Sequence, residues 1–217
     1  MSVVAVIQFD AKSAPSAVVN DKVQEALKGV TPRPEFVLGP QIQDQDILQI
    51  TSEQNDPGSE SKTQSNSLLE NLHILGEPQS IFHIALNRPA FGSNGFATAN
   101  VTEFALSYFP ASRVTPEFQA QIQNDFLEFE RIYSPAATGS RGWASGWLLE
   151  EQNHDGLNGE KANCFCVMRG WDSMDLFQKS LQSDAYKDAI PVLFNWQVPF
   201  KMFSGTFNVF IEHFELC

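Results

Sequence analysis

The sequence has little cysteine, few basic residues and no long apolar run. Of 217 residues, 3 are cysteine and 14 are Lys or Arg, against 26 Asp or Glu, so the formal net charge is −12. No stretch approaches the roughly 20 apolar residues that a membrane-spanning helix needs. A surface this acidic repels phosphate backbones and anionic headgroups. We therefore expect neither nucleic acid nor a membrane as a partner.

The few cysteines and the first residues indicate the compartment. Cys164 and Cys166 are two apart on a predicted strand and share a face, too close to bridge readily. The opening MSVVAVIQFDAKS has no basic lead and no small-residue cleavage site, so it indicates a first strand and not a signal peptide. Free buried thiols are typical of a reducing compartment, and we expect a cytoplasmic protein.

Several cofactor signatures are also missing. The sequence contains no GxGxxG after a strand, no GxxxxGK[ST], no HExxH and no GxSxG. The cysteines have no second Cys/His pair at ligand spacing, so no metal site is predicted. What remains is a globular composition with 42% apolar and 18% charged residues, from which we expect an enzyme or binding protein without a cofactor.

The first half alternates between strand and helix patterns. Strands are predicted from alternating or continuous apolar runs and helices from apolar positions three and four apart. In chain order we expect a strand at 3–11, a helix at 16–29, two strands within 34–54, a helix at 67–75 and a strand at 80–87.

The second half repeats this order more clearly. Thr115 is expected to cap a helix that has Pro116 at its first position and one apolar stripe. The stripe consists of Phe118, Ile122, Phe126, Phe129 and Tyr133. The other predicted elements are strands at 102–110, 142–152, 162–171 and 205–216, and a helical segment at 173–196 broken near Ser183.

Each half therefore has the β-α-β-β-α-β order of a ferredoxin-like unit. The predicted division is an N-terminal, degenerate repeat at 1–87, a linker at 88–101 rich in Pro, Gly, Ser and Asn, and a C-terminal repeat at 102–217. An antiparallel sheet with helices on one face leaves its other face bare, and two such sheets can bury those faces together. We predict the α+β class and a single-chain α+β barrel.

The stretch 171–186 carries a family resemblance. It reads W-D-S-M-D-L-F-Q-K-S-L-Q-S-D-A-Y, in which Trp171 ends a strand, Gly170 is expected to relieve the turn and Ser173 caps a helix. This junction resembles that of the dimeric α+β barrel superfamily, particularly the antibiotic-biosynthesis-monooxygenase-like (ABM) domains. The resemblance covers the second half well, whereas in the first half only the element order agrees.

The resemblance implies a range of activities. The superfamily includes cofactor-free monooxygenases of aromatic polyketides, cyclases, decarboxylases, haem-degrading enzymes and proteins without known activity. Haem degradation in related domains relies on a helix histidine, and the predicted helix at 173–190 has none, which counts against haem. A tandem chain contains both sheets, so the resemblance implies a monomer with an internal pseudo-dimer, and a further homodimer stays open.

Several residues on the predicted strands and helices are candidate catalytic residues. His213 and His83 occupy matching places in the two closing strands, and a histidine inside a barrel could take a proton at neutral pH. We name His213 as candidate base, and Tyr133 and Arg169 as anchors for a substrate oxygen. Each histidine could instead be a core residue bonded to a neighbouring carboxylate, and Arg169 could be a surface residue or an ion-pair partner.

Aromatic residues are the other candidates. The sequence has 18 Phe, and such side chains suit a planar hydrophobic ligand held by stacking. The candidate substrate-binding residues are Trp143, Trp147, Trp171, Phe129, Phe165, His83 and Tyr108. Each of them could equally fill space in the core.

The family resemblance, together with these candidate residues, implies a cofactor-independent tailoring enzyme of secondary metabolism. Its substrate would be a hydrophobic aromatic or polyketide-like molecule, and its first step proton abstraction in an apolar pocket, as in a monooxygenase, cyclase or decarboxylase. Two alternatives stay open. One is a pericyclase-type catalyst that uses shape without a base, and the other is a non-catalytic small-molecule-binding or structural barrel.

Overall fold

A computed structural model of the chain describes residues 2–10, 35–54, 75–92, 95–206 and 208–209. Four strands belong to the first half: β1 (Ser2–Asp10), β2 (Phe36–Pro40), β3 (Ile47–Gln54) and β4 (Ser80–Leu86). The helices predicted at 16–29 and 67–75 lie outside the described residues, apart from Leu75. The turn between β2 and β3 lies at Gln43–Asp46.

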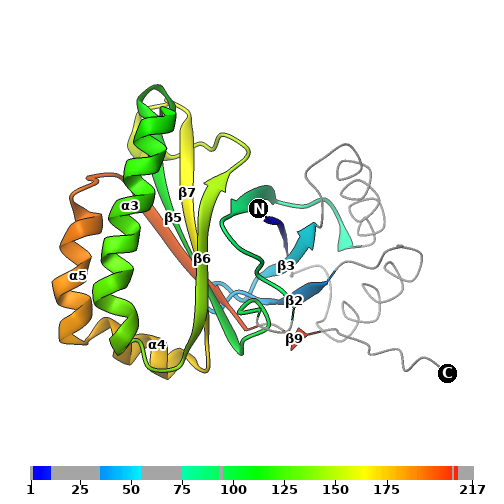
Figure 1. Cartoon of the computed structure of the whole chain (residues 1–217). Coiled ribbons are helices and arrows are strands. Elements are labelled where there is room, and N and C mark those ends of the chain that lie inside the picture. The colour runs from blue at the N-terminus through cyan, green and yellow to red at the C-terminus, as the bar shows by residue number, and fades with distance from the viewer. Residues whose placement is uncertain (1, 11–34, 55–74, 93–94, 207, 210–217) are drawn as a thin grey trace.

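The second half contains strands and three longer helices. The strands are β5 (Val101–Pro110), β6 (Ser140–Leu148), β7 (Ala162–Trp171), β8 (Phe200–Gly205) and β9 (Asn208–Val209). The helices are α3 (Pro116–Tyr133), α4 (Met174–Leu181) and α5 (Asp184–Phe194). Figure 1 shows all three helices on the same side of the C-terminal strands.

The helices begin where the sequence predicts. The Thr115 side chain accepts a hydrogen bond from the Phe118 backbone N–H, and Pro116 follows at the first position of α3. Ser173 caps α4 in the same way, and Ser183 starts α5 after a short break. Each cap satisfies a backbone donor that the first helical turn leaves unpaired.

All strands form one antiparallel sheet in the order β8-β5-β7-β6-β4-β1-β3-β2-β9. β4 joins the two halves by pairing with β6. At the other side β8 pairs with β5, and the chain continues at once into β9, which pairs with β2. The Ile42 N–H also donates to the Ser204 carbonyl at 2.7 Å. The sheet therefore closes on itself, and the predicted single-chain α+β barrel is confirmed.

The barrel interior is filled by side chains from both halves. Alternate residues of each strand point inward. The buried interior cluster includes Val4 and Val6 of β1, Ile84 of β4, and Phe104 and Phe203, whose rings stack at 5.0 Å. Both halves therefore contribute to one hydrophobic core.

The segment predicted as a linker also belongs to this core. Phe91 and Phe96 are buried in the interior cluster, although the segment has a loop composition. A Cβ added at Gly170 of β7 would lie 2.3 Å from the Phe96 carbonyl oxygen. Gly170 therefore allows a close approach between two segments, and does not serve the turn that we expected. The division at residues 87 and 101 stays a prediction.

The last strand differs from the expectation. A strand was predicted at 205–216, but β8 already begins at Phe200 and pairs with β5 from Phe200 to Gly205. Its run FKMFSG is short and follows a helix closely, so its alternation of Phe203 inward and Met202 outward was not recognised. Residues 210–217 lie outside the described part of the chain. The strand predicted at 142–152 runs from Ser140 to Leu148.

Candidate functional site

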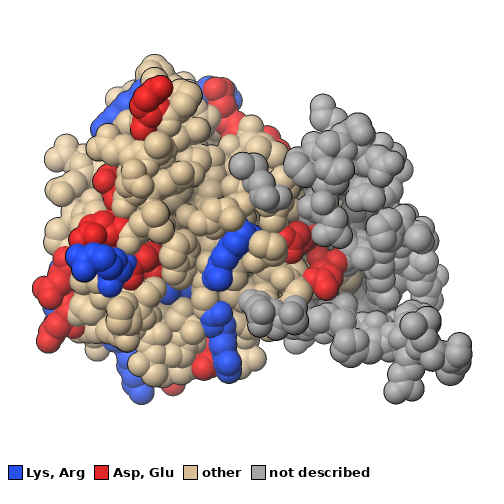
Figure 2. All heavy atoms as spheres, in the orientation of Figure 1, with Lys and Arg blue, Asp and Glu red and all other residues tan. Residues whose placement is uncertain are grey.

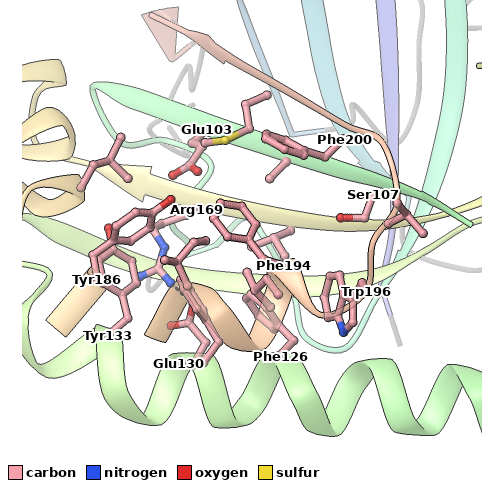
Figure 3. A pocket seen from close by; sticks show the side chains of 18 of the residues that line it. Glu103, Ser107, Phe126, Glu130, Tyr133, Arg169, Tyr186, Phe194, Trp196 and Phe200 are labelled. Atoms are coloured by element: carbon pink, nitrogen blue, oxygen red, sulfur yellow. Dashed lines mark hydrogen bonds and ion pairs between the residues drawn. The ribbon is translucent and has the colours of Figure 1, made fainter. Parts of the chain in front are cut away.

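A cavity of about 300 Å³ lies between the outer face of the C-terminal strands and the helices (Figure 3). Its floor consists of residues from β5, β7 and β8, and its opposite wall of residues from α3 and α5. On β5 the lining residues are Glu103, Ala105 and Ser107, which alternate with the inward-facing Phe104 and Leu106. The volume is at the lower end for small-molecule sites.

Most of the cavity wall is apolar and aromatic. Phe126 and Phe129 of α3 stack at 5.8 Å, and Trp196 reaches the cavity from the segment after α5. The Trp196 indole N–H donates to Asp125 at 3.0 Å, which fixes the ring. Phe194 and Phe200 also line the cavity and are 61% and 58% exposed, so the apolar wall continues to the protein surface. This wall suits a flat hydrophobic ligand.

One end of the cavity holds a buried ion pair. Arg169 of β7 and Glu130 of α3 are only 3% and 4% exposed and form a salt bridge through Arg169 Nη2. Arg169 Nη1 also donates to Ser140 Oγ at 3.1 Å. The guanidinium lies over the Tyr133 ring, with Cζ 5.2 Å from the ring centroid. A buried charge is tolerated only when it is paired in this way.

A second carboxylate, Glu103, lies at the same end. It is opposite Arg169 in the register of β5 and β7, and its Oε2 accepts a hydrogen bond from the Trp171 indole N–H at 2.9 Å. Burial raises the pKa of Glu103, and the nearby Arg169 charge only partly opposes this effect. A carboxyl with a raised pKa is a stronger base, once ionised, than an ordinary carboxylate.

Two tyrosines complete this end. Tyr133 of α3 forms a hydrogen bond of 2.5 Å with Ser180 of α4, and burial raises the pKa of Tyr133 to about 12. Tyr186 of α5 packs edge-on against the Tyr133 ring at 5.5 Å, and burial also raises its pKa. Both hydroxyls therefore stay protonated at neutral pH.

The structure brings part of the predicted site together. Tyr133, Arg169 and Phe129 all line the cavity. Trp171 does not line it, but its indole holds Glu103. Phe165 lies beneath the cavity wall, between Phe126 and Trp196, with ring centroids 5.7 and 6.0 Å away.

The other predicted residues lie elsewhere. Trp143 and Trp147 pack in the same layer between strands and helices but do not line the cavity. Tyr108 points into the barrel interior. His83 lies on the outer face of β4 and is bonded to Glu150 through both its backbone N–H and Nδ1. His213 lies outside the described residues, and its role as a base stays a prediction.

The sequence analysis missed three residues of this site. Glu103 and Glu130 were not considered, and Tyr186 was used only as part of the family motif. Glu103 alternates with apolar neighbours in TEFALSYFP, as a solvent-facing strand residue does. The opposite charges of Glu103 and Arg169 on two predicted strands were the available signal, because such charges often pair across strands.

Within the described ranges, no three His, Cys, Asp or Glu side chains are placed to hold a metal ion. In the same ranges, no helix is long and apolar enough to span a membrane. On the face that Figure 2 shows, Lys and Arg occur in small separate groups among acidic and uncharged residues.

No family model matches the chain. No curated protein matches it by sequence.

Solved structures, in contrast, share its fold. An anthrone oxidase-like protein superposes with a TM-score of 0.63 at 14% identity, over 97% of this chain and 91% of the other. A candidate monooxygenase from Lactobacillus acidophilus superposes with a TM-score of 0.56 at 7% identity, over 95% of this chain and 93% of the other. A haem-binding protein from Thermus thermophilus superposes with a TM-score of 0.53 at 11% identity, over 95% of this chain and 90% of the other. The chain is thus a tandem, single-chain α+β barrel with the fold of monooxygenase-like proteins.

Proposed function

We propose that the protein is a cofactor-independent enzyme that acts on a hydrophobic aromatic or polyketide-like molecule by removing a proton in the cavity. The observation that carries this proposal is the combination of apolar walls with the carboxyl of Glu103, whose pKa burial raises. In such surroundings each remaining polar group acts more strongly than in water. A stabilised carbanion is the expected first product.

The cavity wall supports this substrate class. Phe126, Phe129 and Trp196 offer ring faces and edges to a flat molecule, and about 300 Å³ accommodates two or three fused rings. An anthrone is such a molecule, with a weakly acidic methylene group opposite a carbonyl, and one structural neighbour is described as anthrone oxidase-like. Dioxygen would add to the carbanion, with one oxygen atom retained as a carbonyl and the other released as water. Ring closure or decarboxylation would begin from the same carbanion.

Haem fits this cavity poorly. Among the described residues, no histidine or cysteine lines the wall, although these are the commonest axial ligands of haem iron. No step of the proposed reaction is therefore routed through an iron.

Two alternatives lead to different results. A shape catalyst of the pericyclase type would use the same walls but would not depend on an ionisable residue. A non-catalytic binding protein would hold the ligand unchanged. The raised pKa of Glu103 favours the enzyme with a base, because burying an ionisable carboxyl that only lines a wall costs stability.

The test is oxygen uptake with anthrone as substrate. We expect the protein to consume dioxygen, and mass spectrometry with labelled dioxygen to find one labelled atom in the product. A linear polyketone should be included to detect ring closure or decarboxylation. If both compounds bind but neither changes faster than with heat-denatured protein, the protein is a binding protein and the proposal fails.

A further inference from the structure

The polar groups at the end of the cavity differ in whether their hydrogen-bonding capacity is already used. Arg169 donates through Nη2 to Glu130 and through Nη1 to Ser140. Its charge is neutralised by Glu130, and its flat face lies against the Tyr133 and Trp171 rings. A substrate carboxylate would have to displace a buried partner to bind it, which is costly. Arg169 is thus a structural and positioning residue.

The hydrogen-bonding capacity of the Tyr133 hydroxyl is also already used. Ser180 Oγ lies 2.6 Å from the Phe177 carbonyl, to which it donates its only proton. The 2.5 Å hydrogen bond between Tyr133 and Ser180 must then run from the tyrosine hydroxyl to the serine oxygen. Tyr133 has no proton left for a ligand.

Glu103 retains one oxygen for a ligand. Its Oε2 accepts the Trp171 N–H, and within the described residues no hydrogen bond reaches Oε1. The side chain points from β5 into the cavity toward the tyrosines (Figure 3). The Trp171 bond fixes the carboxyl, and Oε1 is an acceptor that this end of the cavity offers.

Tyr186 is the matching donor. Its side chain lines the same end, and its hydroxyl has no hydrogen-bond partner among the described residues. Contacts with Phe129 and Tyr133 hold the ring edge-on at 6.3 and 5.5 Å. Glu103 and Tyr186 line the same cavity (Figure 3), and the negative charge of Glu103 adds to the effect of burial in raising the pKa of Tyr186.

We propose that Glu103 and Tyr186 form the acid–base pair of the cavity: Glu103 Oε1 takes a proton from the substrate, and the Tyr186 hydroxyl donates a hydrogen bond to the oxygen that becomes negative. The C–H bond breaks, its electron pair is delocalised through the conjugated ring onto the carbonyl oxygen to form an enolate, and the proton stays on Glu103. This rests on the proposed function and adds the residues and the substrate charge.

The substrate charge follows from the charges around the pair. When Glu103 is in the ionised form that acts as a base, the charged residues that line the cavity are Glu103 and Glu130 against Arg169, which leaves one negative charge in excess before proton transfer. A carboxylate ligand would be repelled, whereas a neutral ketone or phenol is accepted. The ligand class is therefore a neutral aromatic ketone or phenol with an acidic hydrogen.

The experiment measures proton transfer without oxygen chemistry. Anthrone is incubated with the protein in D₂O without dioxygen, and exchange of its methylene hydrogens is followed by NMR. We expect enzyme-dependent exchange that falls about 100-fold or more in Glu103→Gln, the size of general-base effects. Tyr186→Phe should lose more exchange than Tyr133→Phe, whose hydroxyl is already used. Glu128→Gln, an exposed change on α3, is the control and should not alter the rate.

Binding gives a second readout. Fluorescence titration should show 2-naphthol binding at least 10-fold more tightly than 2-naphthoate to the wild type, and Glu103→Gln should narrow that ratio. The pair assignment is overturned if Glu103→Gln keeps its exchange while His213→Gln loses it, or if Tyr133→Phe falls further than Tyr186→Phe. If exchange depends on Glu103 but no product forms in air, the pair stands and the proposed oxygenation fails.

Discussion

The barrel interior and the layer between the C-terminal strands and the helices both contain buried polar groups, but of different kinds. In the interior, Gln49 accepts hydrogen bonds from Gln8 at 3.2 Å and Gln41 at 3.0 Å and donates to Thr51. These side chains are neutral and bond to each other. The interior also holds Tyr108, Cys164 and Cys166, and because burial raises the pKa of each they too stay uncharged at neutral pH. In the outer layer, Glu103, Glu130 and Arg169 are ionisable, and Glu103 keeps one oxygen without a partner in the described part of the chain.

The difference separates stability from function. Neutral, mutually bonded amides cost little to bury, whereas an incompletely paired carboxyl in an apolar cavity costs stability. Proteins keep such costs mainly where a group has a task, and ionisable residues with shifted pKa values gather at functional sites. The interior therefore holds the two halves together, and the outer layer of the second half carries the candidate chemistry.

The largest expected effect comes from the interior. Phe104→Ala removes a fully buried ring that stacks on Phe203, and it should lower the free energy of unfolding by about 4 kcal/mol, as for other buried Phe→Ala changes. Because both halves contribute to this core, chemical denaturation should show one cooperative transition.

Ligand binding by the protein that remains folded should be nearly unchanged in this variant, because Phe104 does not line the cavity. Two separate transitions, or a loss of binding without a loss of stability, would contradict the assignment of stability to the interior and of ligand binding to the outer layer.

A smaller effect of opposite sign is expected in the outer layer. Glu103→Gln keeps an acceptor for the Trp171 N–H and removes the cost of the buried ionised carboxylate. It should raise the free energy of unfolding at neutral pH by about 1 kcal/mol while activity falls, as in other exchanges of function for stability.

The pH dependence of the free energy of unfolding tests independently whether ionised Glu103 destabilises the protein. Because the pKa of Glu103 is raised in the folded state, the folded protein binds more protons than the unfolded chain between about 4.5 and the folded value. The contribution to stability is therefore present at low pH and lost as the pH rises through the folded value. Glu103→Gln should lack this loss when urea midpoints are compared across pH. A variant that is less stable than the wild type at neutral pH would contradict the assigned cost.

Local patterns in the sequence predicted much of the fold. The bounds of β7, the caps Thr115 and Ser173, the helix break near Ser183 and the apolar stripe of α3 agree with the structure because each depends on neighbours along the chain. The segment around Phe91 and Phe96 has the composition of a loop, and its burial depends on closure of the barrel around it.

The candidate site was predictable only in part, for the same reason. Tyr133 and Phe129 were found through the helical stripe, and Arg169 through its position near the end of a strand. Glu103 was not predicted, because a polar residue that alternates with apolar residues on a strand indicates a solvent-exposed face. Here α3 and α5 cover that face, and helix packing over a strand is not visible in the strand's own pattern.

The central claim, that the cavity between strands and helices is the ligand site, is tested most directly by filling it. Ala105 lies on the cavity floor, and Ala105→Phe places a ring in that space, whereas Ala120→Phe adds the same ring on the exposed side of α3. Titration with 2-naphthol should show saturable binding to the wild type and to Ala120→Phe, and at least 10-fold weaker binding to a folded Ala105→Phe. Equal binding by all three proteins would contradict the account.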